Sequence, residues 1–291
     1  MKALEIYGPD ANRLLCEKHV ALGYQSRWVV PEEIGETQPL VDRTAEHWFA
    51  FHGRIDNRDE LLAQLPAKYS SNVSDAELFL AHLQTHGESG LNAVIGPFAF
   101  VWFDLRHQRV LAARDAMGGR SLFYHLDDEV LLIATSEAAL IAHEAVPFEL
   151  NAGKVGRLLV GEMDMEPTSV VEAISVFKPG SVLSLDSVEF SMTRFYRAPN
   201  LDFNGWRDAD YAREFRRLLT QATQRRLRAV GRVGSMLSGG LDSVPMTICA
   251  AESSTENVDA YSWVFDAYPE ADERRYSQLV CENFKLTQHQ V

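Results

Sequence analysis

Cysteine is scarce in this chain and long hydrophobic runs are absent. The three cysteines, Cys16, Cys249 and Cys281, are too few and too far apart for a disulfide framework or a zinc site. No stretch approaches the roughly 18 apolar residues of a membrane-spanning helix, and the N-terminus lacks the apolar core of a signal peptide. We therefore expect a cytoplasmic protein with no membrane partner.

Positive charge is also in short supply. The 28 Lys and Arg residues face 41 Asp and Glu residues, a net charge of −13, which disfavours a nucleic-acid partner. One basic cluster remains, at Arg225, Arg226, Arg228 and Arg232. A solvated helix face explains it most simply, although it could instead face ATP or an acidic leader peptide.

The N-terminal two thirds of the chain favours strands joined by tight turns. Residues 47–53 are aromatic and alternating, which is typical of a strand. Ser74 followed by acidic residues predicts a helix start, and Gly87 predicts its end. Further expected elements are short helices at 59–65 and 91–94, hairpins at 98–104/110–114 and 122–125/130–136, and a strand at 181–185. This order predicts two packed antiparallel sheets with helices outside, an α+β domain.

The C-terminal third follows a different pattern. Residues 197–207 are rich in Pro, Asn, Asp and Gly and predict a linker. Helices are expected at 208–230, 244–252 and 274–284, and strands ending at Leu237 and spanning 258–265 and 288–291. Alternating strands and helices are typical of the start of a parallel α/β sheet.

The strongest local motif is the run Ser238-Gly239-Gly240-Leu241-Asp242-Ser243 between a strand and a helix. Two glycines let a phosphate approach backbone N–H groups at a helix N-terminus, and Asp242 adds a carboxylate that can hold Mg²⁺. The Lys of a Walker motif is missing. The alternative is an ordinary glycine turn.

Eight elements, in order, resemble the asparagine synthetase superfamily, which includes β-lactam synthetases and lasso-peptide macrolactam cyclases. They are 38–40 (QPL), 51–61 around Gly53, 74–77 (SDAE), 96–100 (GPFAF), Arg114-Asp115 with Gly118 and Tyr124, Ser136-Glu137 with Leu140, 178–180 (KPG), and 238–243. The resemblance implies a glutaminase-like αββα sandwich of the N-terminal-nucleophile (Ntn) type at 1–200. At 201–291 it implies the beginning of an ATP-binding α/β synthetase (PP-loop) domain, which we expect to be incomplete.

The same resemblance assigns roles within the synthetase part. Ser238, Gly239, Gly240 and Ser243 would hold pyrophosphate, Asp242 would bind Mg²⁺, and Leu237, Val264 and Phe265 would contact adenosine. ATP and Mg²⁺ are thus the expected cofactors. Catalytic residues of the synthetase are expected beyond Val291.

The glutaminase signature is altered. Position 2 is Lys2 rather than the nucleophilic Cys, and Cys16 is internal. In the family's NGE element, His52 and Arg54 replace Asn and Glu; Gly53 and Asp75 are kept, with structural uses as a strand turn and a helix cap. We expect a vestigial glutamine pocket without hydrolytic activity.

These features predict an ATP-dependent amide ligase that acts through an acyl-adenylate. Residues 21–33, 38–40 and 53–61 most closely resemble lasso-peptide cyclases. Those enzymes act on a precursor peptide together with maturation proteins. An asparagine synthase-like enzyme acting on a carboxylate-bearing amino acid, and a truncated non-catalytic family member, are the alternatives. His82 and His86, spaced to clamp a metal, and 127–129 are expected to be solvated instead.

Overall fold

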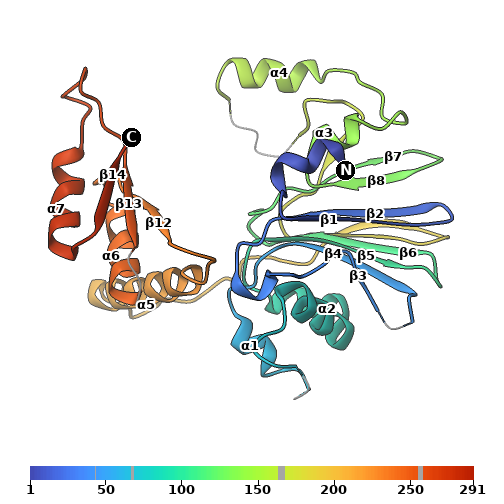
Figure 1. Cartoon of the computed structure of the whole chain (residues 1–291), viewed down its shortest axis with the longest axis horizontal. Coiled ribbons are helices and arrows are strands. Elements are labelled where there is room, and N and C mark those ends of the chain that lie inside the picture. Colours follow the sequence, from blue (N-terminus) through green and yellow to red (C-terminus); the bar gives the residue numbers. More distant parts are fainter. Residues whose placement is uncertain (43, 67–68, 163–167, 255–257) are drawn as a thin grey trace. The chain divides into compact units, whose positions relative to one another are not determined.

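The computed structural model describes residues 1–42, 44–66, 69–162, 168–254 and 258–291. The chain forms two compact units (Figure 1). Unit 1 comprises Met1–Trp28 and Glu32–Pro199, and unit 2 comprises Val29–Pro31 and Asn200–Val291.

Unit 1 is built on a six-stranded antiparallel sheet with the order β11-β10-β6-β5-β4-β3. Its strands are β3 (Leu40–Val41), β4 (His47–Gly53), β5 (Phe98–Asp104), β6 (Arg109–Arg114), β10 (Ser181–Leu185) and β11 (Phe190–Arg194). A second sheet has the order β8-β7-β9, from β7 (Phe123–Leu126), β8 (Leu131–Ala134) and β9 (Ser175–Val176). The hairpin of β1 (Ala11–Glu17) and β2 (Val20–Ser26) forms a separate pair.

Short helices complete unit 1. They are η1 (Lys2–Tyr7), η2 (Pro31–Glu33, whose Pro31 belongs to unit 2), α1 (Arg58–Leu62), α2 (Asp75–His86), η3 (Gly87–Ala93), α3 (Glu137–Ile141) and α4 (Ala152–Leu159). Helix α2 begins with a capping box, in which the Ser74 side chain accepts from Glu77 N–H and the Glu77 side chain accepts from Ser74 N–H.

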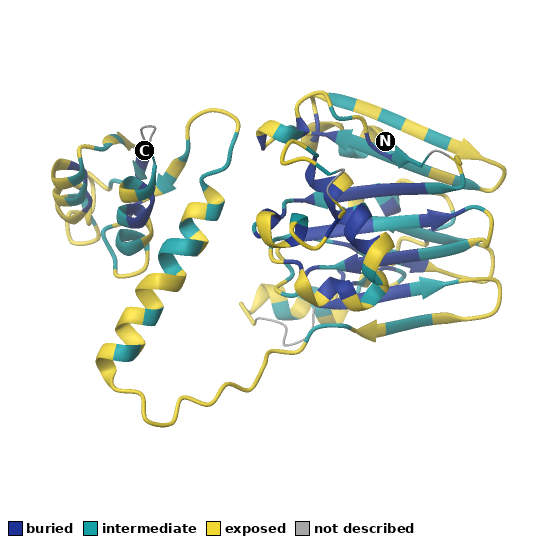
Figure 2. Cartoon of the chain, turned by 90° about the horizontal axis from the view of Figure 1, so that it is seen from below, coloured by how far each residue is buried: buried dark blue, intermediate teal, exposed yellow. Residues whose placement is uncertain are grey.

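Buried residues, coloured dark blue in Figure 2, indicate where the layers of unit 1 meet. One face of the six-stranded sheet packs on α1 and α2, where the Phe79 ring lies 4.9 Å from those of Phe98 and Phe100. The other face, through Ala99 and Leu183, packs on β7 and β8, whose outer side is covered by α3. The arrangement is helix, sheet, sheet, helix, so the predicted fold class is confirmed.

Several of the family-like motifs serve as backbone supports. The buried Asp115 carboxylate accepts from the N–H groups of Phe98, Met117, Gly119 and Arg120. Arg114 donates to the carbonyls of Gly118 (2.8 Å) and Phe177 (2.7 Å), and Gln38 Oε1 accepts from Phe51 N–H (2.7 Å). These bonds fix the loops around the ends of the two sheets.

Unit 2 contains a three-stranded parallel sheet with the order β12-β13-β14. The strands are β12 (Gly234–Met236), β13 (Asp259–Ser262) and β14 (Thr287–Gln290), and the helices are α5 (Asp208–Arg226), α6 (Ser243–Ser253) and α7 (Arg274–Phe284). Leu237, Ala260 and Cys281 form its buried core cluster. The predicted parallel α/β start is confirmed.

The largest differences from the predicted elements lie at the ends and in polar segments. The helix expected at 208–230 ends at Arg226, and the β1–β2 hairpin and α4 were not anticipated. None of the helices in the described residues is both long enough and apolar enough to cross a membrane.

Candidate functional site

The six-residue motif at 238–243 lies at the carboxyl edge of the parallel sheet. Leu237 follows β12, is buried, and donates its N–H to Tyr261 O of β13 at 2.7 Å. Met236 pairs with Tyr261, and Tyr261 with His289, so the carboxyl ends of all three strands meet at this edge. Ligands of open α/β sheets bind at such edges.

Within the turn, the two serines bond to each other. Their hydroxyl oxygens are 3.0 Å apart, and Ser243 Oγ accepts from Ser238 N–H at 3.2 Å. Ser238 Oγ also accepts from Gly240 N–H at 3.2 Å. The N–H groups of Gly239 and of residues 241–243 donate to none of the described residues. This turn therefore offers a group of free donors at the start of α6, as an anion site requires.

The backbone of Gly239 explains the choice of residue there. Its φ is +94°, and a Cβ at this position would lie 2.7 Å from Tyr276 Cβ and 3.4 Å from Glu273 O. A side chain is therefore excluded by conformation and by contact. The first turn of α7 packs directly against the motif, a contact that the sequence analysis missed because the motif does not encode which helix returns to it.

Asp242 has the properties that a cation ligand needs. It is the residue before α6, it is exposed, and its carboxylate caps no helix N–H. This carboxylate makes no hydrogen bond or ion pair with any described residue. A free carboxylate next to free N–H donors suits Mg²⁺ shared with phosphate oxygens.

Val264 and Phe265 lie in the segment that follows β13, at the same sheet edge. Val264 N–H donates to Val291 O at 3.1 Å, and Phe265 is 43% exposed. The Asp272 carboxylate accepts from Phe265 N–H (3.0 Å) and from Arg274 Nε (2.7 Å). The Arg274 guanidinium lowers the pKa of Asp272 to about 2. This bonding holds Phe265 at the edge where adenosine is expected.

The predicted vestigial pocket lies in unit 1, at the end of β4. Gly53 closes the strand, and a Cβ there would lie 2.3 Å from Pro97 O. Arg54 is turned to Asp56, with Nε 2.9 Å from Oδ1. Asp75 is completely buried, accepts from Ile55 N–H at 2.8 Å and forms an ion pair with Arg58. The helix cap expected at Asp75 is Ser74 instead, and Asp75 is the first helical residue.

His52, the residue before Gly53 in β4, is half-buried. Burial, with the charge of Arg120 in addition, lowers the pKa of His52 to about 4. Its Nδ1 atom has no partner within the described part of the chain. Burial raises the pKa of Glu36 to about 7, against the hydrogen bonds from Ser74 and Gln38. At neutral pH His52 is therefore uncharged, and Glu36 is partly protonated.

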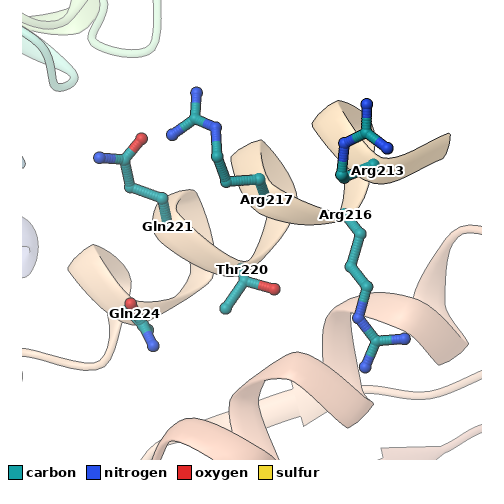
Figure 3. A pocket seen from close by; sticks show the side chains of 6 residues that line it. All are labelled: Arg213, Arg216, Arg217, Thr220, Gln221 and Gln224. Atoms are coloured by element: carbon teal, nitrogen blue, oxygen red, sulfur yellow. The ribbon is translucent and has the colours of Figure 1, made fainter. Parts of the chain in front are cut away.

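A shallow recess of about 490 Å³ lies along α5 (Figure 3). It is lined by Arg213, Arg216, Arg217, Thr220, Gln221 and Gln224. Arg217 and Gln221 point away from the neighbouring helix in Figure 3, whereas Arg216 points toward it and lies 3.5 Å from Glu252. Asp210 and Glu214 pair with Arg213 and Arg217. Since each arginine already has a carboxylate, we do not regard this recess as a ligand site.

Two smaller expectations need correction. His82 is buried, not solvated, and its Nε2 atom lies 3.0 Å from Gly90 O, with the His86 ring 4.5 Å away between centroids. No group of three metal-ligating side chains occurs among the residues described, at these histidines or elsewhere. In the basic cluster, Arg232 lies outside α5 and bonds to Asp259. The 127–129 loop is exposed, as expected, and Asp127 accepts from the N–H groups of Glu129 and Val130.

Comparison with known proteins agrees with these two regions. Residues 1–196 match the family described as "Glutamine amidotransferase domain", and residues 214–291 match "Asparagine synthase". The chain is 26% identical to asparagine synthetase [glutamine-hydrolyzing] 1 of Bacillus subtilis over 239 residues, which cover 81% of this chain and 37% of that protein. It is 24% identical to synthetase 2 of the same organism over 301 residues, 99% of this chain and 40% of that one.

The chain therefore spans well under half the length of these two relatives. Among solved structures, it resembles the glutamine phosphoribosylpyrophosphate amidotransferase of B. subtilis in complex with ADP and GMP. The TM-score is 0.40 and the identity 15%, over 93% of this chain and 66% of that one. So low a score adds nothing to the family matches.

Proposed function

The chain belongs to the asparagine synthetase family, and from that premise we propose that it carries the nucleotide-binding turn of an ATP-dependent amide ligase. One observation supports this most directly. The N–H groups of Gly239 and of residues 241–243 are free of partners among the described residues and lie beside the free carboxylate of Asp242. That arrangement suits the phosphates of a Mg²⁺-nucleotide.

The proposed reaction has two steps. A substrate carboxylate oxygen attacks the α-phosphorus of ATP, the bond to the bridging oxygen breaks, and pyrophosphate leaves. An amine then attacks the acyl carbon, loses a proton and displaces AMP. The free N–H groups of the turn would stabilise the charge on the departing pyrophosphate. Mg²⁺ held by Asp242 would supply further neutralisation of that charge.

The nitrogen source is proposed to be free ammonia or another amine, as in an asparagine synthase-like enzyme that does not use glutamine. His52 and Arg54 replace the family's Asn and Glu, and Arg54 is paired with Asp56. Cys16 lies within β1, opposite Ala21. Releasing Cys16 as an N-terminal thiol would remove residues 11–15 from the hairpin with β2.

A specific feature favours a second candidate, a lasso-type cyclase that closes a macrolactam with an amine of the same peptide. Residues 261–266, followed by 269–274, resemble the second synthetase strand and the stretch after it in those cyclases. The Asp272–Arg274 pair gives this stretch a fixed shape beside the phosphate turn. In this alternative the substrate is a precursor peptide rather than a free amino acid.

The test uses a protein that contains this chain with a complete synthetase domain. AMP and pyrophosphate formation is measured with aspartate plus ammonium, aspartate plus glutamine, and a linear peptide. We expect ammonium to support turnover and glutamine to release no glutamate above background. Turnover only with the peptide would favour the cyclase instead. Glutamate release would contradict the proposed nitrogen source, and no AMP under any condition would reject the ligase.

The matched variants are Asp242→Asn and the exposed Asp208→Asn on α5. Loss of the metal ligand should lower turnover at least tenfold, because the charge on pyrophosphate is then less well neutralised. Asp208→Asn should leave turnover within about twofold of the parent, as expected for an exposed surface substitution. Equal turnover in the two variants would show that Asp242 is not a metal ligand of this site.

A further inference from the structure

The first turn of α7 brings an aromatic side chain to the phosphate turn. Tyr276 Cβ lies where a Gly239 side chain would begin, 2.7 Å from the position of that Cβ. Tyr276 is 44% exposed, so its ring is only partly covered. Ser277 is buried beneath it and donates its hydroxyl to Arg274 O at 3.0 Å, which fixes the start of the helix.

The neighbouring Arg275 lies on this ring. Its guanidinium carbon is 4.4 Å from the centre of the Tyr276 ring, and it also donates to the Tyr276 hydroxyl. Both contacts order a long side chain that would otherwise be free in solvent. Tyr276 Cβ and Ser277 N both lie within 3.3 Å of a Cβ placed at Gly239, so Arg275 belongs to the turn of α7 that contacts the phosphate turn.

Arg275 differs from the other arginines of this region in having no carboxylate partner. Arg274 pairs with Asp266 and Asp272, and Arg232 pairs with Asp259. For Arg275 the part of the chain that the structure describes provides no ion pair. An exposed guanidinium with no carboxylate partner, on the helix turn that contacts the phosphate turn, suits a phosphate group, because an arginine fork can contact phosphate with two hydrogen bonds.

The segment that carries Arg275 is held in place independently of any ligand. Asp272 accepts from Phe265 N–H and from Arg274 N–H (2.9 Å), which ties the start of α7 to the end of β13. One loop therefore holds both Phe265 and the start of α7, the helix that carries Arg275. This pre-ordering reduces the entropy that binding would otherwise lose.

We propose that Arg275, supported by Tyr276, is an additional phosphate-binding residue of the nucleotide site and contacts the pyrophosphate end of the nucleotide. This inference rests on the proposed function, because it needs phosphate to occupy the 238–243 turn. It adds a residue from α7 that lies outside the motif, and it requires no further cofactor.

The test is an NMR titration of the 291-residue chain, observing the amide signals of Gly239 and Gly240. The probes are inorganic pyrophosphate with Mg²⁺, and adenosine, each up to high millimolar concentration. Arg275→Gln should weaken pyrophosphate binding about tenfold, the effect of losing one charge-assisted contact, and leave adenosine binding unchanged. Tyr276→Phe keeps the ring but loses the hydroxyl, and should weaken pyrophosphate binding by a smaller factor.

Arg213→Gln is the control, because Arg213 is an exposed arginine of α5 in the same unit. It should bind pyrophosphate within about twofold of the parent, as expected for an exposed surface substitution. If Arg275→Gln binds as the parent does while Asp242→Asn binds more weakly, the inference is wrong and the proposed function stands. If pyrophosphate and adenosine leave the glycine signals of the parent unchanged, both are overturned.

Discussion

At the scale of single residues, the buried carboxylate of Asp75 in unit 1 has a charged partner. Asp75 is fully buried, and it balances Arg58 while accepting the N–H of Ile55. Removing one member of such a pair leaves the other charge buried and unpaired, and this typically lowers stability by roughly 3 kcal/mol or more. The family resemblance points to Asp75 as a pocket residue, whereas its contacts give it a role in folding.

We accordingly expect Asp75→Ala to lower the free energy of unfolding by roughly 3 kcal/mol, measured by urea denaturation. Asp59→Ala, at an exposed position of α1, is the control and should change stability by less than about 0.5 kcal/mol. A loss below about 1 kcal/mol for Asp75→Ala would show that the ion pair does not determine the fold here.

Glu36 leads to a prediction about pH. Its pKa is raised from 4.5 to about 7, so between these values the unfolded chain releases the proton before the folded chain does. Stability from this group is therefore present below about pH 4.5 and falls as the pH rises through 7. Glutamine at position 36 does not titrate, so Glu36→Gln removes this loss. The free energy of unfolding of the variant minus that of the parent should therefore increase by about 2 kcal/mol from pH 5 to pH 8.

The comparison is made by denaturant titration at the two pH values. His52, whose lowered pKa of about 4 acts in the opposite direction, is present in both proteins and cancels from the difference. The same stability difference at pH 5 and pH 8 would mean that the Glu36 carboxyl is not desolvated in solution.

At the scale of elements, the contact between the phosphate turn and α7 can be tested with two glycines. Gly239 and Gly231 both have positive φ values, +94° and +82°. Alanine at either position meets the same kind of backbone strain, on the order of 1 kcal/mol. A Cβ at Gly231 would meet open space, whereas one at Gly239 would collide with Tyr276.

We expect Gly239→Ala to displace the first turn of α7 and to abolish pyrophosphate binding, and Gly231→Ala to lose stability only. Amide exchange at residues 274–277 is the measurement, since faster exchange there reports the displaced turn. If the two variants change this exchange equally, the contact with α7 is not what selects glycine at 239.

Elements with a strong local signal were predicted from the sequence, and those without one were missed. Strand β4 and helix α2 have an aromatic run and a capping box, and both were anticipated closely. In β1 the pattern is inverted, because Leu14 is exposed and Arg13 is partly covered through its bond to Pro39 O. Helix α4 has Val155, Leu158 and Leu159 at helical spacing, but it is short and contains two glycines, which lower helix propensity, and none of its residues is buried.

The candidate site divides in the same way. The turn residues were predicted because backbone donors and a carboxylate follow one another in the chain. The contribution of α7 was not, since Tyr276 meets Gly239 only after the chain has passed through α6, β13 and the Asp272–Arg274 loop. Contacts between distant segments depend on packing, which a single motif does not encode.

On the scale of the whole molecule, the two units differ in the size of their cores. Among the residues that the structure describes, seventeen buried residues form the main cluster of unit 1, whereas three form that of unit 2. Larger clusters remove more apolar surface from water and resist opening. We expect the slowest amide exchange in β4, β5 and β6, and clearly faster exchange in β12, β13 and β14.

Hydrogen exchange followed by mass spectrometry on the intact chain tests this expectation. The control within the same data is α5, which has no buried residue and should exchange at least as fast as the parallel strands. Uniformly slow exchange from residue 233 onward would contradict it and would indicate a unit 2 as stable as unit 1.

The side-chain hydrogen bonds that support the backbone of unit 1 also affect what can be inferred from membership of a protein family. Four family-like residues use their side chains for hydrogen bonds to main-chain groups or to the Glu36 carboxylate; they are Gln38, Ser74, Arg114 and Asp115. Residues of this kind make a chain identifiable as a member of a family, although they show only that the fold has been inherited. A domain of this kind can therefore change or lose its chemistry during evolution and still match its family. A match that rests on these positions indicates the fold and does not indicate the activity.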